Sequence, residues 1–342
     1  QNPATSNYVL DTLASNNYKY AETIYASYLS INKQFKKTGV RLGLRAENTV
    51  VDAADLESDF KLKRNYTNLF PNFSIDHNEK NNSYQFKISR RIFRPGYQDL
   101  NPYRSYQDNY SISTGNPYLI PQKNLNFSFT HGFKHTIYTT LTYVRAKDFM
   151  LHYDYQIDST KETVNTAANL NGNNYHVWAS IYIQKQIKKW WNLSMNSYTG
   201  FMHFEGILNG TNLERQVHDY NIWTNNDFSL PKDIKLQVTM FYAGPTAYGV
   251  FQHKSKWALD IGLRKNFFKD KLSLNVTMFD IFYKNVEHMT ADFQNMNLDF
   301  RNPFDTRRIW VFLRYKFGKI KVQKRQVEGN DSEKSRIDKK LN

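Results

Sequence analysis

Histidine and carboxylate side chains are the groups through which this chain could catalyse a reaction or bind a metal ion. The chain has nine histidines and 31 aspartates and glutamates, but no cysteine. It therefore lacks thiol catalysis and cysteine-ligated zinc sites. His131 and His135 fall on one face of a predicted strand, but they flank a turn and no third ligand is evident. We predict that both are interfacial or turn residues and that the chain holds no metal.

The motifs of common hydrolases and nucleotide-binding enzymes are missing. The sequence has no His-Glu-x-x-His helix, no Gly-x-Ser-x-Gly elbow and no glycine-rich phosphate loop. The acidic pairs Asp55 with Glu57 and Asp331 with Glu333 fall in polar segments, where solvation explains them without a glycosidase pair. We therefore predict no catalytic residues, no cofactor and no enzymatic activity.

A formal net charge of +15 raises the possibility of nucleic-acid binding. The basic residues are scattered along the chain, however, and the densest run is the tail at residues 319–342. Lys188, Lys189, Trp190 and Trp191 could form a stacking platform for bases. At a short turn, the same cluster is better explained as a membrane-interface anchor with snorkelling lysines. We therefore predict no nucleic-acid partner.

The elements that would position any site are β-strands, because apolar and polar residues alternate along the whole chain. By this pattern the strands are roughly 12 to 20 residues long, against about 5–6 in a typical soluble sheet. A tilted membrane strand needs about 9–11 residues for the hydrocarbon layer alone. A soluble two-sheet sandwich is the alternative, but these lengths and the bulky polar face favour a barrel with a wet lumen. The alternation is clearest at residues 40–47, 125–130, 234–240, 272–278 and 309–317.

Short and long connections alternate between these strands, as they do in outer-membrane barrels. Short turns are predicted near residues 36–38, 80–82, 132–134, 188–189, 231–233 and 269–270. Longer connections are predicted around residues 51–65, 94–121, 156–161, 206–214, 243–250 and 287–300. The pattern gives about thirteen strands. Because bacterial barrels close with an even number, either this count is off by one or further strands lie outside this chain, and we favour the second explanation.

Composition agrees with a barrel rather than with membrane helices. No run reaches the roughly 18 apolar residues of a transmembrane helix, and the mean hydropathy is −0.70. Aromatic residues make up 16% of the chain, with 24 Tyr, 24 Phe and 6 Trp. Such rings suit the two girdles where a barrel crosses the membrane interfaces.

The segment 89–122 carries motifs that point to a family. In order, they are Ser89-Arg90-Arg91, Arg94-Pro95, Leu100-Asn101-Pro102 and Gly115-Asn116-Pro117-Tyr118-Leu119-Ile120-Pro121. This segment resembles the barrel of TonB-dependent outer-membrane receptors, in particular the outer-membrane β-barrel family abundant in Bacteroidetes-type bacteria. The ending 313–318 with its basic tail is also similar, as is the segment 43–47.

The resemblance implies an architecture larger than this chain. Family members carry a plug domain and a TonB-contact segment, neither of which appears here, and a barrel of 22 strands. If the last strand is number 22, the first is number 10, which runs from outside to inside and makes residues 1–18 an outer loop. We expect residues 1–318 to be the carboxy-terminal barrel portion, without the plug, and residues 319–342 to be a periplasmic tail.

The function implied by the resemblance is import of a scarce solute across the cell outer membrane when TonB pulls on the plug. The implied partners are outer-membrane lipid, lipopolysaccharide, the TonB complex and an unidentified solute. A passive pore or adhesin-like barrel without TonB coupling is the first alternative, and an outer-membrane hydrolase is a weaker one. A plug domain and a TonB-contact segment upstream would support import over the pore.

The loop at residues 94–121 is the part of the chain where a ligand could bind outside the membrane. Its prolines fix φ and remove N–H donors, so that the loop cannot extend the sheet. Its tyrosines could bind a ligand, or they could simply pack the loop into the barrel mouth. The candidate ligand contacts are Arg94, Tyr97, Asn101, Tyr103, Tyr106, Tyr110 and Tyr118.

Overall fold

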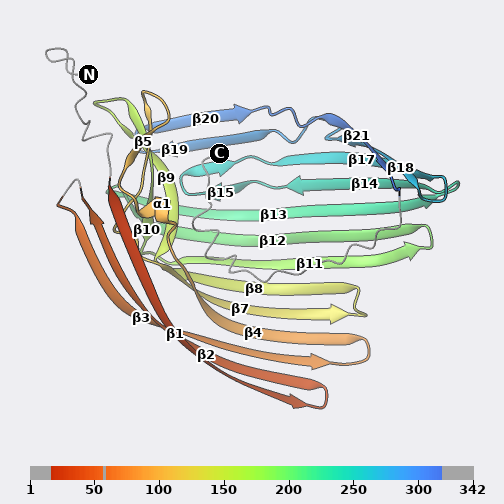
Figure 1. The fold of residues 1–342 in the computed structure, drawn as a ribbon, viewed down its shortest axis with the longest axis horizontal. Coiled ribbons are helices and arrows are strands. Elements are labelled where there is room, and N and C mark those ends of the chain that lie inside the picture. The colour runs from red at the N-terminus through yellow and green to blue at the C-terminus, as the bar shows by residue number, and fades with distance from the viewer. Residues whose placement is uncertain (1–16, 57–58, 318–342) are drawn as a thin grey trace.

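Residues 17–56 and 59–317 are described by the computed structural model, and they form an all-β fold (Figure 1). Most of the expected outer loop at residues 1–18, Glu57 and the basic tail at residues 319–342 lie outside the described residues. In the described part of the chain, the one helix is α1 (Tyr97–Leu100), and no helix is long and apolar enough to cross a membrane.

One antiparallel sheet of thirteen strands dominates the structure, and its strands pair in chain order. Figure 1 shows the sheet curving like a trough between its edge strands, β1 and β21. The predicted thirteen-stranded sheet is therefore confirmed. In sheet order the strands are β1 (Tyr18–Phe35), β2 (Thr38–Asp55), β3 (Lys61–Asn78), β4 (Asn82–Phe93), β7 (Gln122–Phe133), β8 (Ile137–Lys147), β11 (Asn174–Lys188), β12 (Trp191–Leu208), β13 (Thr211–Leu230), β14 (Ile234–Ala243), β17 (Lys256–Phe267), β18 (Leu272–Phe279) and β21 (Arg308–Tyr315).

Two four-stranded sheets are built from the longer connections, and they lie with α1 at the end opposite the short turns (Figure 1). In both sheets, hairpins continue the strands of the large sheet beyond the barrel wall. The first contains β5 (Arg104–Tyr106), β6 (Ser111–Thr114), β10 (Glu162–Leu170) and β9 (Phe149–Ile157). The second contains β15 (Thr246–Tyr248), β16 (Phe251–His253), β19 (Glu287–Phe293) and β20 (Met296–Asn302).

All six predicted short turns lie between paired strands of the large sheet. Positive φ angles at Lys36, Lys134, Lys232 and Lys269, between 48° and 62°, reverse the chain there. The polar side chains at these turns stay in solvent, whereas apolar and polar side chains alternate along the strands between them.

Two predicted long connections are much shorter than expected. Residues 206–214 form a two-residue hairpin in which Asn209 and Gly210 have φ angles of 48° and 77°. An Asn-Gly pair with two positive φ angles is the favoured two-residue turn, because its twist matches that of the strands. Residues 51–65 are mostly strand, with only residues 56–60 between β2 and β3.

The alternating residues divide the sheet into an apolar and a polar face. In β2, Leu42 and Leu44 are 50% and 46% exposed, whereas Glu47 and Thr49 are buried on the opposite face. An outward apolar band and a polar interior are what a lipid-embedded barrel requires.

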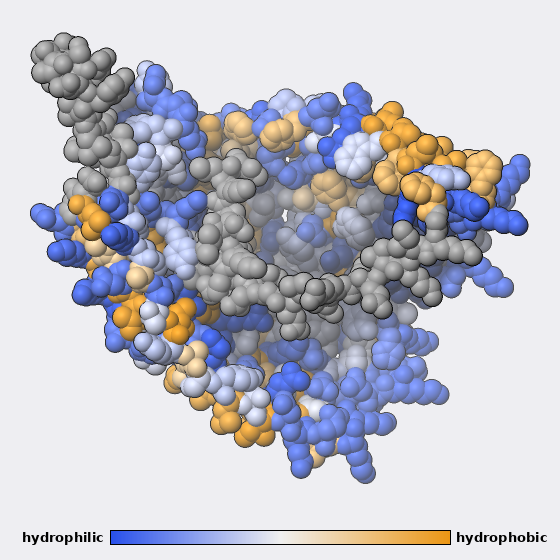
Figure 2. All heavy atoms as spheres, viewed as in Figure 1, coloured by the Kyte–Doolittle hydropathy of each residue, from blue (hydrophilic) through white to orange (hydrophobic). Residues whose placement is uncertain are grey.

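The edge strands β1 and β21 each have one neighbour among the described strands. Apolar side chains gather at the β21 edge, visible in orange at the upper right of Figure 2. Ile309, Val311 and Leu313 are 62–67% exposed, and Trp310 and Phe312 on the other face are 57% and 61% exposed. Each edge strand thus has one side that pairs with no other described strand, beside exposed apolar side chains.

Candidate functional site

The Arg-Pro loop between β4 and β7 has a compact fold of its own. The backbone N–H of Gly96 donates to the Asp99 carboxylate at 3.0 Å, which closes the turn of α1. Gly115 lies so close to the chain that a Cβ there would stand 2.4 Å from the Asn101 carbonyl oxygen. Its N–H donates to that same oxygen at 2.9 Å. Only glycine fits this position, which explains the Gly-Asn-Pro motif without reference to a ligand.

Arg94 fastens this loop to the barrel wall rather than pointing into open space. Its guanidinium lies 2.5 Å from the Glu47 carboxylate on β2 and 3.3 Å from the Glu22 carboxylate on β1. The side chains of Arg94, Glu22 and Glu47 are only 11%, 4% and 8% exposed. Arg45 contacts Glu47 from its other side at 2.5 Å, but it is 46% exposed. The cluster therefore depends on one buried cation shared by two buried carboxylates.

Further contacts hold the end of the loop in place. Leu100 and Leu119 are buried against Ala167 of β10, with Tyr20 of β1 packed beside them. Arg64 of β3 donates to the Leu119 carbonyl at 2.6 Å and to the neighbouring carbonyl at 3.0 Å. The loop is thus attached both to the wall and to the outer hairpin.

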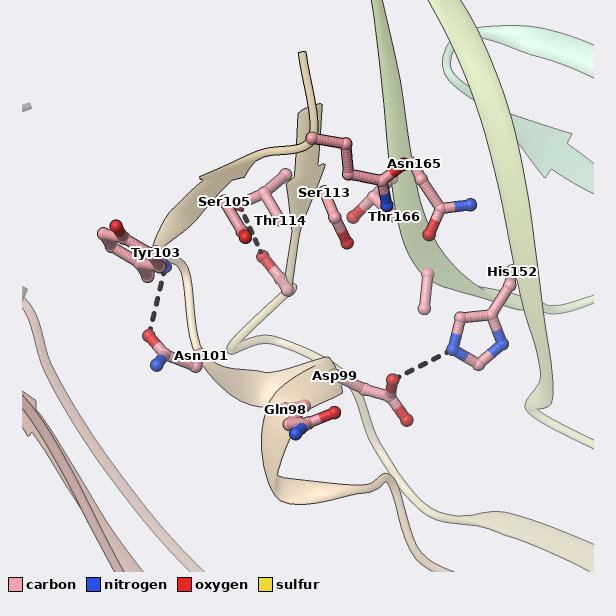
Figure 3. Close-up of a pocket in the computed structure, with 13 residues that line it drawn as sticks. Gln98, Asp99, Asn101, Tyr103, Ser105, Ser113, Thr114, His152, Asn165 and Thr166 are labelled. Carbon is pink, nitrogen blue, oxygen red and sulfur yellow. Dashed lines mark hydrogen bonds and ion pairs between the residues drawn. The ribbon is translucent and has the colours of Figure 1, made fainter. Parts of the chain in front are cut away.

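A cavity of about 280 Å³ opens between this loop and the β9–β10 hairpin (Figure 3). Its lining comes from α1 and the residues after it, from β5 and β6, and from β9 and β10. Strand β6 pairs with β10 in parallel, which sets Ser113 beside Asn165 across 52 residues of sequence. This pairing turns a loop and a hairpin into one rigid wall of the cavity.

Apart from Gly115 and Ala167, the residues that line this cavity have polar side chains, most of them uncharged, although carbon atoms make up much of the exposed surface. The exception is a pair in which Asp99 and His152 lie 2.9 Å apart (Figure 3). Asn165 donates to Asp154 at 2.5 Å, and Thr114 donates to the Pro102 carbonyl at 3.0 Å. These internal bonds orient the lining.

Some polar groups of the lining remain available to a ligand. Four side chains of the lining make no hydrogen bond to any other residue in the described part of the chain. They are Ser105, Gln107, Ser113 and Thr166.

The seven predicted contacts fall into four groups. Asn101 and Tyr103 line the cavity. Tyr97 packs against Tyr20 with ring centroids 5.6 Å apart, beside a neighbouring cavity of about 530 Å³. Arg94 is buried in the ion cluster described above, which assigns it a structural contact with the wall.

The remaining three tyrosines lie outside the 280 Å³ cavity, with exposed rings. They are Tyr106, Tyr110 and Tyr118. Sequence reasoning missed Ser113, His152 and Asn165, which line the cavity.

Two carboxylates of the outer hairpins have shifted pKa values. A hydrogen bond from Lys256 lowers the pKa of Glu287 below its ordinary value, and His253 at 2.7 Å adds to this effect against the cost of burial. The backbone N–H of Tyr110 donates to Asp108 at 2.7 Å and lowers the pKa of that exposed carboxyl. Both groups therefore stay ionised in mildly acidic solution.

One group of side chains could hold a metal ion. His203, Glu205 and Glu214 have ligand atoms within 4.8 Å of one another. Glu205 and Glu214 are cross-strand partners on β12 and β13, and the backbone N–H of Asn173 donates to Glu205 at 2.8 Å. This cluster could not be predicted from the sequence, because only the β12–β13 register brings Glu214 beside His203 and Glu205. His131 instead stacks on Tyr84 at 5.0 Å.

Aromatic rings mark both ends of the wall on its outward face. Trp191 and Phe228 are cross-strand partners beside a short turn, with ring centroids 5.9 Å apart. Ten residues along β12, Phe201 lies 6.4 Å from Tyr175 of β11. About 9–11 tilted residues cross the hydrocarbon layer, so this separation matches one membrane thickness.

Comparison with known protein families identifies the family of this chain. Residues 1–315 match the family model described as the outer membrane protein beta-barrel family. The chain belongs to this family. Membership of this family places the chain in a β-barrel of the cell outer membrane, in agreement with the apolar outward face of its large sheet. Comparison with curated proteins found no match.

Solved structures of outer-membrane receptors share its fold. The ferric-catecholate import receptor Fiu from E. coli K12 superposes with a TM-score of 0.60 at 12% identity, over 87% of this chain and 45% of Fiu. The copper transporter OprC gives 0.64 at 11% identity, over 87% of this chain and 49% of OprC. The FrpB iron transporter (F3-3 variant) from Neisseria meningitidis gives 0.58 at 13% identity, over 90% and 47%. The chain thus spans about half the length of these proteins.

Proposed function

We propose that this chain forms the carboxy-terminal wall, residues 1–318, of a TonB-dependent importer, with residues 319–342 as a periplasmic tail. Among the described strands, β1 and β21 each pair with one neighbour, and this supports the proposal, because an open sheet edge in hydrocarbon costs several kcal/mol per unsatisfied backbone group. Additional strands beside both edges would pair those groups. The solved receptors, about twice as long as this chain, also favour a larger barrel.

The observation that carries an importing role is the loop at residues 94–121. A passive pore needs an open mouth, whereas this loop is fixed to the wall by the buried Arg94 cluster and encloses a polar cavity. A fixed, concave polar surface at the outer end is suited to capturing a solute. We therefore favour a binding receptor over a pore, and we assign no catalytic residue to it.

The cargo of the solved receptors does not identify the cargo here. Fiu is a ferric-catecholate import receptor and OprC a copper transporter, but identities of 11–12% establish the shared fold alone. Solute-contacting loops vary freely on a common barrel.

Two measurements on the intact protein test this function. In planar lipid bilayers, a plugged receptor is expected to show negligible steady conductance, whereas a passive pore conducts continuously. In cells, uptake of a labelled panel of neutral trisaccharides and one ferric tricatecholate is compared with and without TonB. Continuous conductance together with TonB-independent uptake would contradict the proposal and favour the pore.

A further inference from the structure

The cavity beside β6 and β10 differs from the rest of the protein in its charge. The chain carries 46 lysines and arginines, yet none of them lines this cavity. The nearest in sequence, Arg104, directs its guanidinium to Glu162 at 3.4 Å. The one basic side chain in the lining is His152, and it is already paired with Asp99. An anionic ligand would therefore find no cation available to it in this lining.

The absence of lysine and arginine from this lining indicates which ligand charge the cavity can accept. Binding of carboxylates, phosphates or catecholates in a concave site relies on charge-assisted hydrogen bonds from arginine or lysine. Removing an anion from water without such partners is costly. The lining therefore suits a ligand without net charge.

The available groups define what a neutral ligand must offer. Ser105, Ser113 and Thr166 contribute hydroxyls, each a donor and an acceptor, and Gln107 contributes an amide. They come from β5, β6, β10 and the β5–β6 turn, which the paired strands hold in fixed positions. A ligand rich in hydroxyl groups satisfies such a mixed set, since each of its own hydroxyls also donates and accepts.

A tyrosine lies at the edge of the cavity. This residue, Tyr103, has 36% of its surface exposed (Figure 3). Its ring points away from the other lining side chains, so the hydroxyl and amide groups are what a ligand in the cavity would contact (Figure 3). The volume of about 280 Å³ is at the small end for ligand pockets, which suits one terminal sugar unit of a longer chain.

We propose that this cavity binds the end of a neutral saccharide, and that the cargo of the importer is a neutral glycan. The inference rests on the proposed function and names its substrate class. Ser113 and Thr166 hydrogen-bond the sugar hydroxyls, and the Asp99–His152 pair closes one side of the cavity.

Calorimetric titration of the intact, detergent-solubilised protein tests this inference. The probes are maltotriose, cellotriose, xylotriose and chitotriose, with a ferric tricatecholate as the anionic comparison. We expect at least one trisaccharide to bind and the anionic chelate not to bind in this cavity. Ser113→Ala is expected to raise the saccharide Kd about tenfold, and combination with Thr166→Val to raise it further.

The matched control is Ser111→Ala on the same strand. The Ser111 hydroxyl donates to Asp108 at 2.8 Å and does not line the cavity, so the Kd should stay within about twofold of the parent value. Circular dichroism and the heat-dependent gel shift of folded barrels confirm that each variant is folded.

The outcomes separate the substrate class from the transport function. Binding and import of the ferric chelate without binding of any trisaccharide would overturn the saccharide inference and leave import standing. Saccharide binding that depends on Ser113, without TonB-dependent uptake, would support the cavity chemistry and contradict the importer. If no trisaccharide binds, or if Ser113→Ala and Ser111→Ala behave alike, the inference is wrong.

Discussion

Replacement of Arg94 by glutamine should release the Arg-Pro loop from the barrel wall. The change removes the one cation that lies between the Glu22 and Glu47 carboxylates, whose side chains are 4% and 8% exposed. Breaking a buried ion pair by deleting one partner costs about 3–5 kcal/mol, because it leaves an uncompensated buried charge. Here two carboxylates lose their shared partner, so we take about 3 kcal/mol as the lower value. At about 1.4 kcal/mol per factor of ten, the open loop should become on the order of a hundredfold more populated.

Hydrogen exchange measured by mass spectrometry detects this opening directly. The backbone N–H groups of Gly115, Asn116 and Leu119 donate hydrogen bonds within the loop and should be protected in the parent protein. We expect Arg94→Gln to speed the exchange of these three N–H groups on the order of a hundredfold. Peptides from the β12–β13 hairpin should exchange at unchanged rates, because they lie outside the cluster.

Arg45→Gln is the matched control for this prediction. Arg45 contacts the same Glu47 carboxylate at 2.5 Å, but its side chain is 46% exposed, and exposed pairs contribute at most about 1 kcal/mol. Its effect on loop exchange should therefore be severalfold at most. Adding Glu22→Gln and Glu47→Gln to Arg94→Gln should restore part of the protection, since no buried charge then remains. Equal exchange in Arg94→Gln and Arg45→Gln would refute the role of the buried cluster.

Three further predictions concern the turn, the girdle and pH. Gly210→Ala should lower the free energy of unfolding by about 1–2 kcal/mol in urea titrations, because φ at this residue is +77° although a Cβ would meet no atom within 4 Å; an unchanged midpoint would contradict this. Trp191→Ala should lower the free energy of unfolding in lipid bilayers by about 2 kcal/mol, because the ring packs on Phe228 and its N–H donates to Asn226 at 3.1 Å. A loss no larger than that of an ordinary exposed substitution would contradict the role of Trp191 in the aromatic girdle. The lowered pKa of Glu287 gives the β19–β20 hairpin stability that is fully present above about pH 4.5 and is lost as the pH falls through the lower folded value. Proteolysis of this hairpin should therefore accelerate with acidification in the parent, and Glu287→Gln should flatten this pH dependence.

The strands and their faces could be predicted because the determining pattern is local. Alternation has a period of two residues, so the sequence of each strand alone indicates which of its side chains face lipid. Leu42 and Leu44 are exposed on the apolar face, and Glu47 is on the opposite one, as their alternation predicted. The short turns followed from polar residues between alternating segments. The Asn209-Gly210 turn was equally readable, but the expectation of a long outer loop there was wrong.

The cavity and the buried charges could not be predicted, because they depend on pairings between distant segments. The parallel contact of β6 with β10 places Ser113 beside Asn165, and no local pattern specifies that pairing. Arg94 was a candidate ligand contact from its motif alone, whereas its contacts with Glu22 and Glu47 require the loop to fold back onto β1 and β2. The amino-acid sequence by itself determined an alternating antiparallel wall with an apolar outward face, because a strand's side-chain direction is set residue by residue. Only the tertiary structure decided which polar groups meet above that wall, because loop docking depends on contacts between segments tens of residues apart.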